Sequence, residues 1–232
     1  TGGSTRGSVT ESSSKSNKSN KSNPSTKSNT NKSTHNNPET PNACLFGRKL
    51  KDLQWNEDAE VPEFVFDVLE FLGQDEQIQE GLFRLSGTFS RIQSLQERLD
   101  SGERLKDMRL GPTDCHNVTS LLKQFLRRLP EPLLTFELYD AWRALGAWTE
   151  NPVVSVRIAR FLVGCLDLER RGGILRRLMA FLNEKLGDVE LTRMNACNFG
   201  TVIGPNLLWH PQEERHSKQS STLGLSLQSS TL

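Results

Sequence analysis

The sequence lacks the marks of several large protein classes. No apolar run approaches the roughly 20 residues that a membrane-spanning helix needs. The N-terminus carries no apolar signal region. No Gly-x-x-x-x-Gly-Lys-Ser/Thr segment occurs, which argues against a phosphate-binding loop. We therefore expect no transmembrane segment and no nucleoside triphosphate site within the chain itself.

Metal-binding and catalytic clusters are also missing from the sequence. The four cysteines are far apart and form no Cys-x-x-Cys pair, and the four histidines are scattered. We expect no metal site and no cofactor. Cys115, Cys165 and Cys197 fall inside helical patterns, which is typical of buried free thiols in a reducing compartment. This pattern favours a cytoplasmic protein.

Net charge is close to zero, and apolar residues are scarce. The 232 residues carry a net charge of +1, and only 34% of them are hydrophobic. The deficit is concentrated in residues 1–43, which are mostly Ser, Asn, Thr and Lys and have a net charge of 6 − 2 = +4. Such a tail cannot bury enough apolar surface to fold, so we expect it to be disordered. A linker is the preferred interpretation, with weak contact to acidic lipid as the alternative.

Nucleic acid is a poor candidate for a partner. The basic tail holds no aromatic residue that could stack on bases, and the remainder of the chain has a net charge of about −3 by subtraction. Any membrane contact would be indirect or would run through the tail.

Apolar residues at helical spacing dominate the rest of the chain and predict an all-α domain. Residues 44–212 form the expected domain, and residues 213–232 form a polar C-terminal tail. A Gly-Gly pair at residues 172–173 is expected to interrupt the helical pattern. Helices are predicted near residues 62–73, 88–99, 114–129, 138–145, 152–166, 175–187 and 192–204.

One short segment, Glu-Gly-Leu-Phe-Arg-Leu-Ser-Gly at residues 80–87, has glycines on both sides of an apolar run that a single arginine interrupts. One interpretation is a strand or turn with a surface arginine. The other is a loop fixed by burial of Phe83 and Leu85, with Arg84 held outward. The pattern alone does not choose between them.

The predicted helix at residues 114–129 has an apolar face and a narrow polar stripe. Asp114 is expected to cap it. Lys123 and Arg127 are four residues apart on that stripe with no acid between them, a mildly unfavourable pair. A solvated surface is the commoner explanation of such spacing.

Three segments together resemble the Rho-type GTPase-activating (RhoGAP) domain family. They are Glu-Gly-Leu-Phe-Arg-Leu-Ser-Gly at 80–87, LLKQFLRRLPEPLLTFELYD at 121–140 and MNACNFGTVIGPNLLW at 194–209. The sequence departs from the family's usual pattern at Arg128, where an acid is usual, and at Phe199 and Gly200, where Leu-Ala is usual. The resemblance implies a single RhoGAP-like helical bundle.

The resemblance also implies a function and a set of site residues. Arg84 matches the family's catalytic arginine finger, and Arg127 would brace the loop that carries it. Lys123 and Asn198 would contact the GTPase, with Asn206 a weaker candidate. The chain would then be no enzyme itself but an activator of a GTP-bound Rho-family small GTPase, of Rho or Rac type. The alternative is a RhoGAP-like module that binds small GTPases or scaffolds signalling proteins without catalysis.

Overall fold

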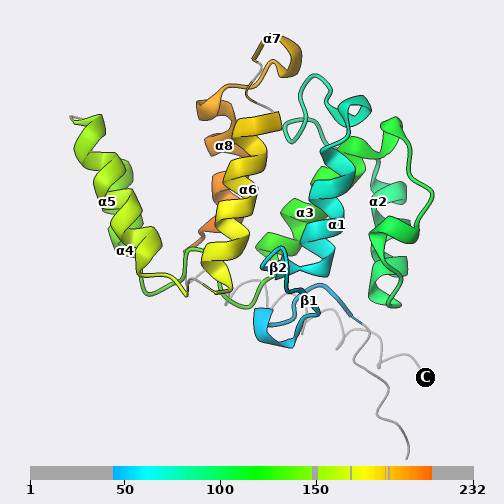
Figure 1. The fold of residues 1–232 in the computed structure, drawn as a ribbon, viewed down its shortest axis with the longest axis horizontal. Coiled ribbons are helices and arrows are strands. Elements are labelled where there is room, and N and C mark those ends of the chain that lie inside the picture. Colours follow the sequence, from blue (N-terminus) through cyan, green and yellow to red (C-terminus); the bar gives the residue numbers. More distant parts are fainter. Residues whose placement is uncertain (1–43, 148–150, 168, 186, 188, 211–232) are drawn as a thin grey trace, which may run out of the picture. The chain divides into compact units, whose positions relative to one another are not determined.

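The computed structural model describes residues 44–147, 151–167, 169–185, 187 and 189–210. Over these residues the regular secondary structure is helical apart from two short strands, so the predicted all-α class is confirmed (Figure 1). The two predicted tails lie outside the described residues. The α-helices are α1 (Glu63–Leu72), α2 (Phe89–Asp100), α3 (Cys115–Arg127), α4 (Tyr139–Ala147), α5 (Pro152–Gly164), α6 (Arg171–Lys185), α7 (Val189–Thr192) and α8 (Ala196–Leu207). Two short strands, β1 (Trp55–Asn56) and β2 (Val61–Pro62), pair antiparallel.

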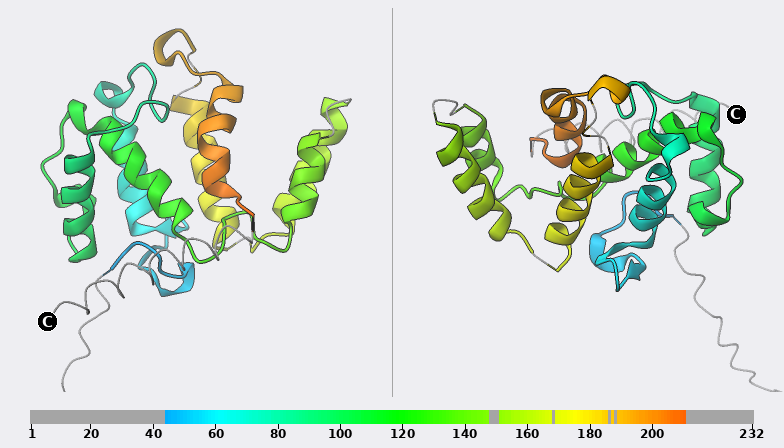
Figure 2. Two further views of the ribbon diagram at one scale, coloured as in Figure 1. Left: turned by 180° about the vertical axis from the view of Figure 1, so that it is seen from behind. Right: turned by 45° about the horizontal axis from the view of Figure 1, so that its top comes forward.

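Helix α3 is the central element. It packs against α1, α2 and α8, and Figures 1 and 2 show these helices around it. Its apolar residues Leu121, Leu122, Phe125 and Leu126 are almost completely buried. This burial follows from their helical spacing, which places them on adjoining faces of one helix.

A cluster of three phenylalanines joins the N-terminal segment to this helix. The ring of Phe64 on α1 lies 5.1 Å from that of Phe125 and 5.9 Å from that of Phe46, between ring centroids. These separations suit tilted and edge-on aromatic contacts. The segment before α1 is therefore part of the core, and the described domain begins before the first long helix.

The expected interruption at residues 172–173 is wrong. Both glycines lie inside α6 and are buried. A Cβ at Gly173 would be 2.4 Å from the carbonyl oxygen of Glu60, in the turn between β1 and β2. Glycine is needed there because the helix packs directly against that turn, and the packing outweighs glycine's low helix propensity.

Helix α5 begins as predicted but is not the buried helix that its sequence suggested. The Asn151 side chain accepts hydrogen bonds from the backbone N–H groups of Val153 (3.1 Å) and Val154 (3.3 Å), which caps the helix. Leu162 is the only buried residue of α5, and Phe161 is exposed. The reason is that α5 packs mainly against α4, which has no buried residue of its own.

The boundaries of α8 also differ from the prediction. Its cap is Asn195, and Thr192 is instead the buried last residue of α7. The helix runs through Pro205 to Leu207, because the backbone N–H of Leu208 bonds the Gly204 carbonyl and continues the helical pattern after the proline.

The thiols are less buried than expected. Cys115 is buried, and this burial raises the pKa of its thiol. Cys165 and Cys197 are exposed, so the expectation of burial is wrong for both. Cys165 follows the exposed helix α5, and Cys197 lies on the outer side of α8.

None of the described helices is long and apolar enough to cross a membrane.

Candidate functional site

The arginine predicted as a finger lies in a tight turn, hereafter the Arg84 loop (residues 80–87). The Gly81 carbonyl accepts hydrogen bonds from the N–H groups of both Arg84 and Leu85, each at 2.8 Å. Gly81 and Phe83 both have left-handed backbones, with φ of 71° and 70°. A positive φ is normal for glycine and costly for phenylalanine, so other contacts must hold Phe83 in place.

Packing of the Phe83 ring supplies one of those contacts. The ring is 1% exposed and meets Phe181 of α6 and Phe199 of α8 edge-on, with centroid distances of 6.5 and 6.3 Å. Leu82 beside it is fully buried. Two consecutive buried residues leave the next one, Arg84, to project outward.

Arg84 is exposed and only weakly tied to the protein. Its side chain is 45% exposed, and Nη2 lies 3.9 Å from Oε1 of Glu80. An exposed pair at this distance contributes little to stability. The guanidinium can therefore leave Glu80 for a stronger acceptor at low cost.

Lys123 supplies the second contact that fixes the turn. Its ammonium Nζ donates a 2.6 Å hydrogen bond to the Phe83 carbonyl, 40 residues away in sequence. Burial lowers the pKa of Lys123. Burial also lowers the pKa of neighbouring His116, with a smaller contribution from the charge of Lys123.

The far end of the Arg84 loop is bonded to α3. The Gly87 N–H donates to Ser120 Oγ (3.2 Å), and the Thr88 N–H donates to Asn117 Oδ1 (2.8 Å). A Cβ at Gly87 would be 2.3 Å from that same Asn117 oxygen. Only glycine fits so close an approach, which explains the second glycine of the motif.

The near end of the loop is bonded to α7. The Gly81 N–H donates to the Thr192 carbonyl at 2.8 Å. The Arg84 loop is thus held at both ends and in the middle, while its arginine is exposed.

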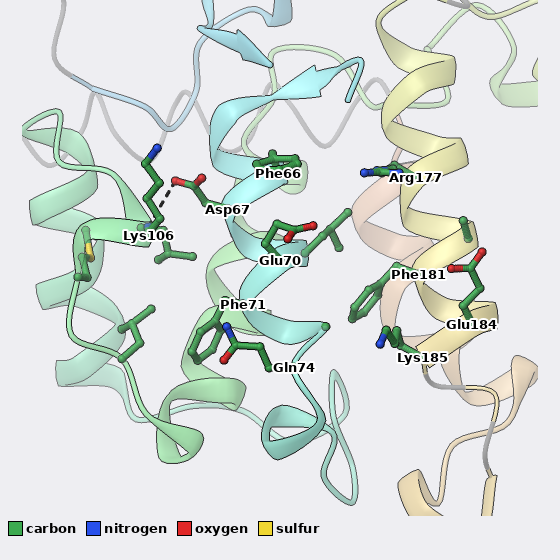
Figure 3. Close-up of a pocket in the computed structure, with 16 residues that line it drawn as sticks. Phe66, Asp67, Glu70, Phe71, Gln74, Lys106, Arg177, Phe181, Glu184 and Lys185 are labelled. Atoms are coloured by element: carbon green, nitrogen blue, oxygen red, sulfur yellow. Dashed lines mark hydrogen bonds between the residues drawn. The ribbon is translucent and has the colours of Figure 1, made fainter. Parts of the chain in front are cut away.

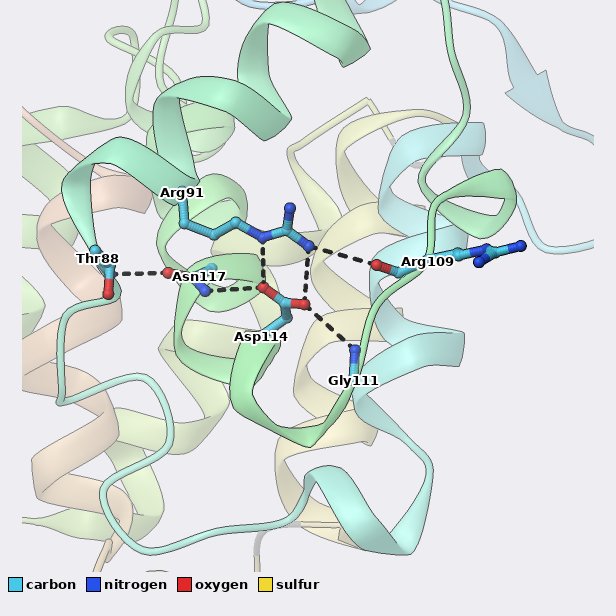
Figure 4. A network of polar contacts seen from close by, with 6 residues as sticks. All are labelled: Thr88, Arg91, Arg109, Gly111, Asp114 and Asn117. Carbon is cyan, nitrogen blue, oxygen red and sulfur yellow. Dashed lines mark hydrogen bonds and ion pairs between the residues drawn. The ribbon is translucent and has the colours of Figure 1, made fainter.

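A charged network supports the start of α3 behind the loop (Figure 4). Arg91 of α2 makes two hydrogen bonds to Asp114, at 2.8 and 3.0 Å. Asp114 also accepts from the Asn117 side chain (3.0 Å) and the Gly111 N–H (3.3 Å). These donors, Arg91 first, hold the pKa of Asp114 below its ordinary value.

The predicted capping role of Asp114 is wrong in its details. Its side chain makes no N-cap bond to the α3 backbone, and the residue ends the 3₁₀ turn Pro112–Asp114. Through Asn117 it orients the amide that holds Thr88. Asp114 is therefore a positioning residue for the end of the Arg84 loop.

The two cations on α3 differ in their contacts with the Arg84 loop. Lys123, expected to face a GTPase, makes the contact with the Arg84 loop. Arg127, expected to brace that loop, is exposed and makes no hydrogen bond to it in the part of the chain described. The physical reason is that the loop crosses α3 at the level of Lys123, one helical turn before Arg127.

The two asparagines of the last motif differ in availability. Asn198 is partly exposed, and its Oδ1 accepts from the Asn195 N–H at 3.0 Å in a capping box, which leaves its amide Nδ2 to donate elsewhere. Asn206 is 9% exposed, and its Nδ2 bonds the Val202 carbonyl of its own helix at 2.9 Å. The geometry therefore does not support Asn206 as a contact residue.

Three supports of the Arg84 loop were not predicted from the sequence: Ser120, Asn117 and Thr192. Ser120 and Asn117 lie on the polar side of α3 that also carries Lys123, so helical spacing could have indicated them. The contribution of Thr192 is a backbone carbonyl, for which the side-chain sequence holds no signal.

The larger cavities lie beside the site. One of about 750 Å³ opens between α1 and α6 and is lined by Phe66, Glu70, Arg177 and Phe181, among others (Figure 3). A second, more apolar groove of about 500 Å³ follows α6 and α8. Neither is lined by Arg84, Lys123 or Arg127. The described residues contain no cluster of side chains suited to a metal ion.

Known proteins with similar sequences include Rho GTPase-activating proteins. SH3 domain-binding protein 1 of Homo sapiens is 34% identical over 148 residues, which are 64% of this chain and 20% of that protein. Rho GTPase-activating protein gacY of Dictyostelium discoideum is 32% identical over 168 residues, 71% of this chain and 23% of that protein. The chain therefore matches only about a fifth of the length of these relatives.

Solved structures show the same fold. The crystal structure of human Rho GTPase activating protein 15 matches with a TM-score of 0.64 and 26% identity, covering 72% of this chain and 79% of that one. The BH domain from GRAF, the GTPase regulator associated with focal adhesion kinase, matches with a TM-score of 0.56 and 26% identity, covering 63% and 78%. The family model of the RhoGAP domain matches residues 62–212, and the chain belongs to that family.

Proposed function

We propose that this domain accelerates GTP hydrolysis by a Rho-family small GTPase, of Rho or Rac type, by inserting Arg84 into the GTPase's nucleotide site. The observation that carries the proposal is the Arg84 loop, in which an exposed arginine follows two buried residues on a backbone bonded to α3 and α7. A rigid base keeps the loss of freedom on insertion small.

The chemistry needs one further cation. In GTP hydrolysis, negative charge spreads over the oxygens of the transferring phosphoryl group, and the GTPase supplies Mg²⁺, a phosphate loop and a glutamine that orients water. A guanidinium is flat, permanently charged and able to donate two parallel hydrogen bonds. Supplied in trans, such an arginine is worth about 10³ to 10⁵ in rate.

The other residues then take supporting roles. Lys123 holds the Phe83 carbonyl and thereby the direction of the Arg84 side chain. Arg127, exposed on the next turn of α3, contacts the GTPase, and Asn198 donates its amide to the GTPase backbone. The chain contributes no nucleotide site of its own, and its partner is the GTP-bound form. We place this action in the cytoplasm, with membrane contact through the GTPase or the basic N-terminal tail.

A panel of GTP-loaded small GTPases tests the proposal. Phosphate release from Rho, Rac and Ras proteins is measured in single turnovers with and without the full chain. We expect acceleration of at least about 10³ for a Rho or Rac protein and none for Ras. Binding to the panel without acceleration would favour the alternative of a non-catalytic binding module. A chain that neither binds these GTPases nor accelerates their GTP hydrolysis would contradict any role on them.

A further inference from the structure

Phe89 stands out beside the Arg84 loop. It is 80% exposed, more than any other large apolar side chain among the described residues. Leu85, next to Arg84, is 47% exposed, whereas one of the two interpretations of the sequence had it buried. A phenylalanine can bury about 150–250 Å² in an interface. Leu85 and Phe89, hereafter the anchor pair, therefore offer apolar area on both sides of residues 86–88, of which Ser86 and Thr88 are exposed.

Hydrogen bonds hold the backbone at both residues of the anchor pair. The Thr88 N–H bonds Asn117, and the Thr88 carbonyl accepts from the Ile92 N–H in the first turn of α2. Leu85 is fixed by the bond from its N–H to the Gly81 carbonyl. Rigid aromatic side chains lose little conformational freedom on binding, which is one reason that they recur as interface hot spots.

The anchor pair lies within reach of an ordinary-size interface centred on Arg84. Leu85 adjoins Arg84, and Phe89 is five residues away, so its Cα lies at most about 18 Å from that of Arg84. An interface of ordinary size buries about 800 Å² on each partner and extends about that far from its centre. An interface of that size centred on Arg84 therefore extends as far as the anchor pair.

We propose that the anchor pair docks against an apolar patch beside the nucleotide site of the same GTPase that receives Arg84, with Phe89 as the main affinity determinant. This inference rests on the proposed function. Arg84 supplies charge that matters in the transition state, whereas the anchor pair supplies apolar contact that is equal in the ground and transition states. The two contributions should therefore separate in kinetics.

The test compares Phe89→Ala with Phe161→Ala in the full chain. Phe161, on α5, is 70% exposed and is a matched control for loss of an exposed phenyl ring. The GTPase is the Rho or Rac protein that the wild-type chain activates, loaded with a non-hydrolysable GTP analogue for binding and with GTP for single turnovers. We expect Phe89→Ala to weaken Kd at least tenfold, to leave the rate at saturation within about twofold, and to be partly rescued by Phe89→Leu. Phe161→Ala should leave both unchanged.

The remaining outcomes separate failure of the anchor-pair proposal from failure of the proposed function. Unchanged affinity of Phe89→Ala for a GTPase that the wild type activates overturns the anchor pair and leaves the proposed function intact. An equal loss in Phe161→Ala, or a fall in the saturated rate with Kd unchanged, also overturns it. A wild-type chain that neither binds nor activates any member of the panel overturns the proposed function and the anchor pair with it.

Discussion

At the scale of single residues, the unusual backbone of Phe83 connects packing with chemistry. A left-handed conformation costs a non-glycine residue about 1–2 kcal/mol. Burial of its ring against Phe181 and Phe199, and the bond from Lys123 to its carbonyl, offset that cost. The direction of Arg84 thus depends on a strained neighbour that the core holds in place.

Lys123→Met should reduce the GTPase-activating rate more than binding. Methionine keeps the length of the side chain but removes the donor, leaving the Phe83 carbonyl without its ammonium partner. We expect the saturated single-turnover rate to fall by about 10- to 100-fold, because a small misplacement of a reacting group is costly. We expect Kd to change less than threefold and the melting temperature to fall by a few degrees.

Arg127→Ala is the matched change on the same helix. Its exposed charge should contribute to affinity, so Kd should weaken, and the loss should shrink at high salt. The saturated rate should be nearly unchanged. If instead Arg127→Ala lost rate and Lys123→Met lost only affinity, the roles indicated by the sequence would be right and those inferred from the geometry wrong.

Gly87→Ala should destabilise the domain. The added Cβ would lie 2.3 Å from Asn117 Oδ1, so the Arg84 loop or α3 must shift. We expect a loss of about 1–3 kcal/mol in the free energy of unfolding, measured by chemical denaturation. Gly102→Ala is not a suitable control because its φ of 94° is strained for alanine, but Gly146→Ala meets no atom within 4 Å. Gly146→Ala, in the exposed helix α4, should not destabilise the domain and can stabilise it by up to about 1 kcal/mol. An equal loss of stability in the two variants would contradict the close-contact explanation.

At the scale of elements, α2 and α3 are joined by an ion pair that depends on pH. The Asp114 pKa lies below the ordinary value of 3.8 because Arg91 and other donors stabilise its charged form. A carboxyl whose pKa is lower in the folded state adds stability above its unfolded pKa. That stability is lost as pH falls through 3.8 and then through the lower, folded value.

Asp114→Asn should therefore change the acid end of the stability profile. Near pH 7 the variant should be less stable than the wild type by about 1–3 kcal/mol, since Arg91 loses a charged acceptor. The gap should narrow as pH falls below about 4, where the wild-type carboxyl becomes protonated. Chemical denaturation of both proteins from pH 3 to 7 measures this difference in the free energy of unfolding. A difference that is constant across this range would contradict the lowered pKa of Asp114.

Helices could largely be predicted from sequence, but their contacts could not. Apolar spacing indicated the main helices, and the family resemblance of residues 80–87 singled out Arg84. The Arg84 loop contacts α3 beside Lys123 and not beside Arg127. The position along the helix at which the loop packs is set by the tertiary fold, and local sequence does not encode it. One interpretation of the sequence had Phe83 and Leu85 both buried, but the turn that Gly81 closes buries Phe83 and leaves Leu85 exposed.

The Gly172–Gly173 pair shows the same limit. Glycine inside a helix weakens it in isolation, so the sequence favoured a break. The structure uses Gly173 for close approach to Glu60, a residue more than 100 positions earlier. Long-range packing of this kind reverses a local preference, and only the folded chain reveals it.

At the scale of the whole molecule, the core of the described residues starts at Phe46 with Leu45 packed against it, and residues 1–43 have too few apolar side chains to add to a core. A chain that begins at Cys44 should therefore keep the melting temperature and the GTPase-activating rate of the full chain. Thermal unfolding and single-turnover hydrolysis would show this. A drop in melting temperature of more than about 5 °C, which corresponds to roughly 1 kcal/mol, would mean that residues 1–43 contribute to the fold.

The central claim is that Arg84 acts in the transition state of a reaction in another protein. The most direct measurement is single-turnover GTP hydrolysis by the activated Rho or Rac protein with saturating Arg84→Ala, beside a binding titration against the same GTPase holding a non-hydrolysable analogue. Because an interaction made only in the transition state affects rate and not ground-state affinity, we predict a loss of activation of about 10² to 10⁴ with Kd within threefold of wild type. Arg84→Lys should also be poor, since an ammonium lacks the two-pronged contact. Activation that survives Arg84→Ala would contradict the account.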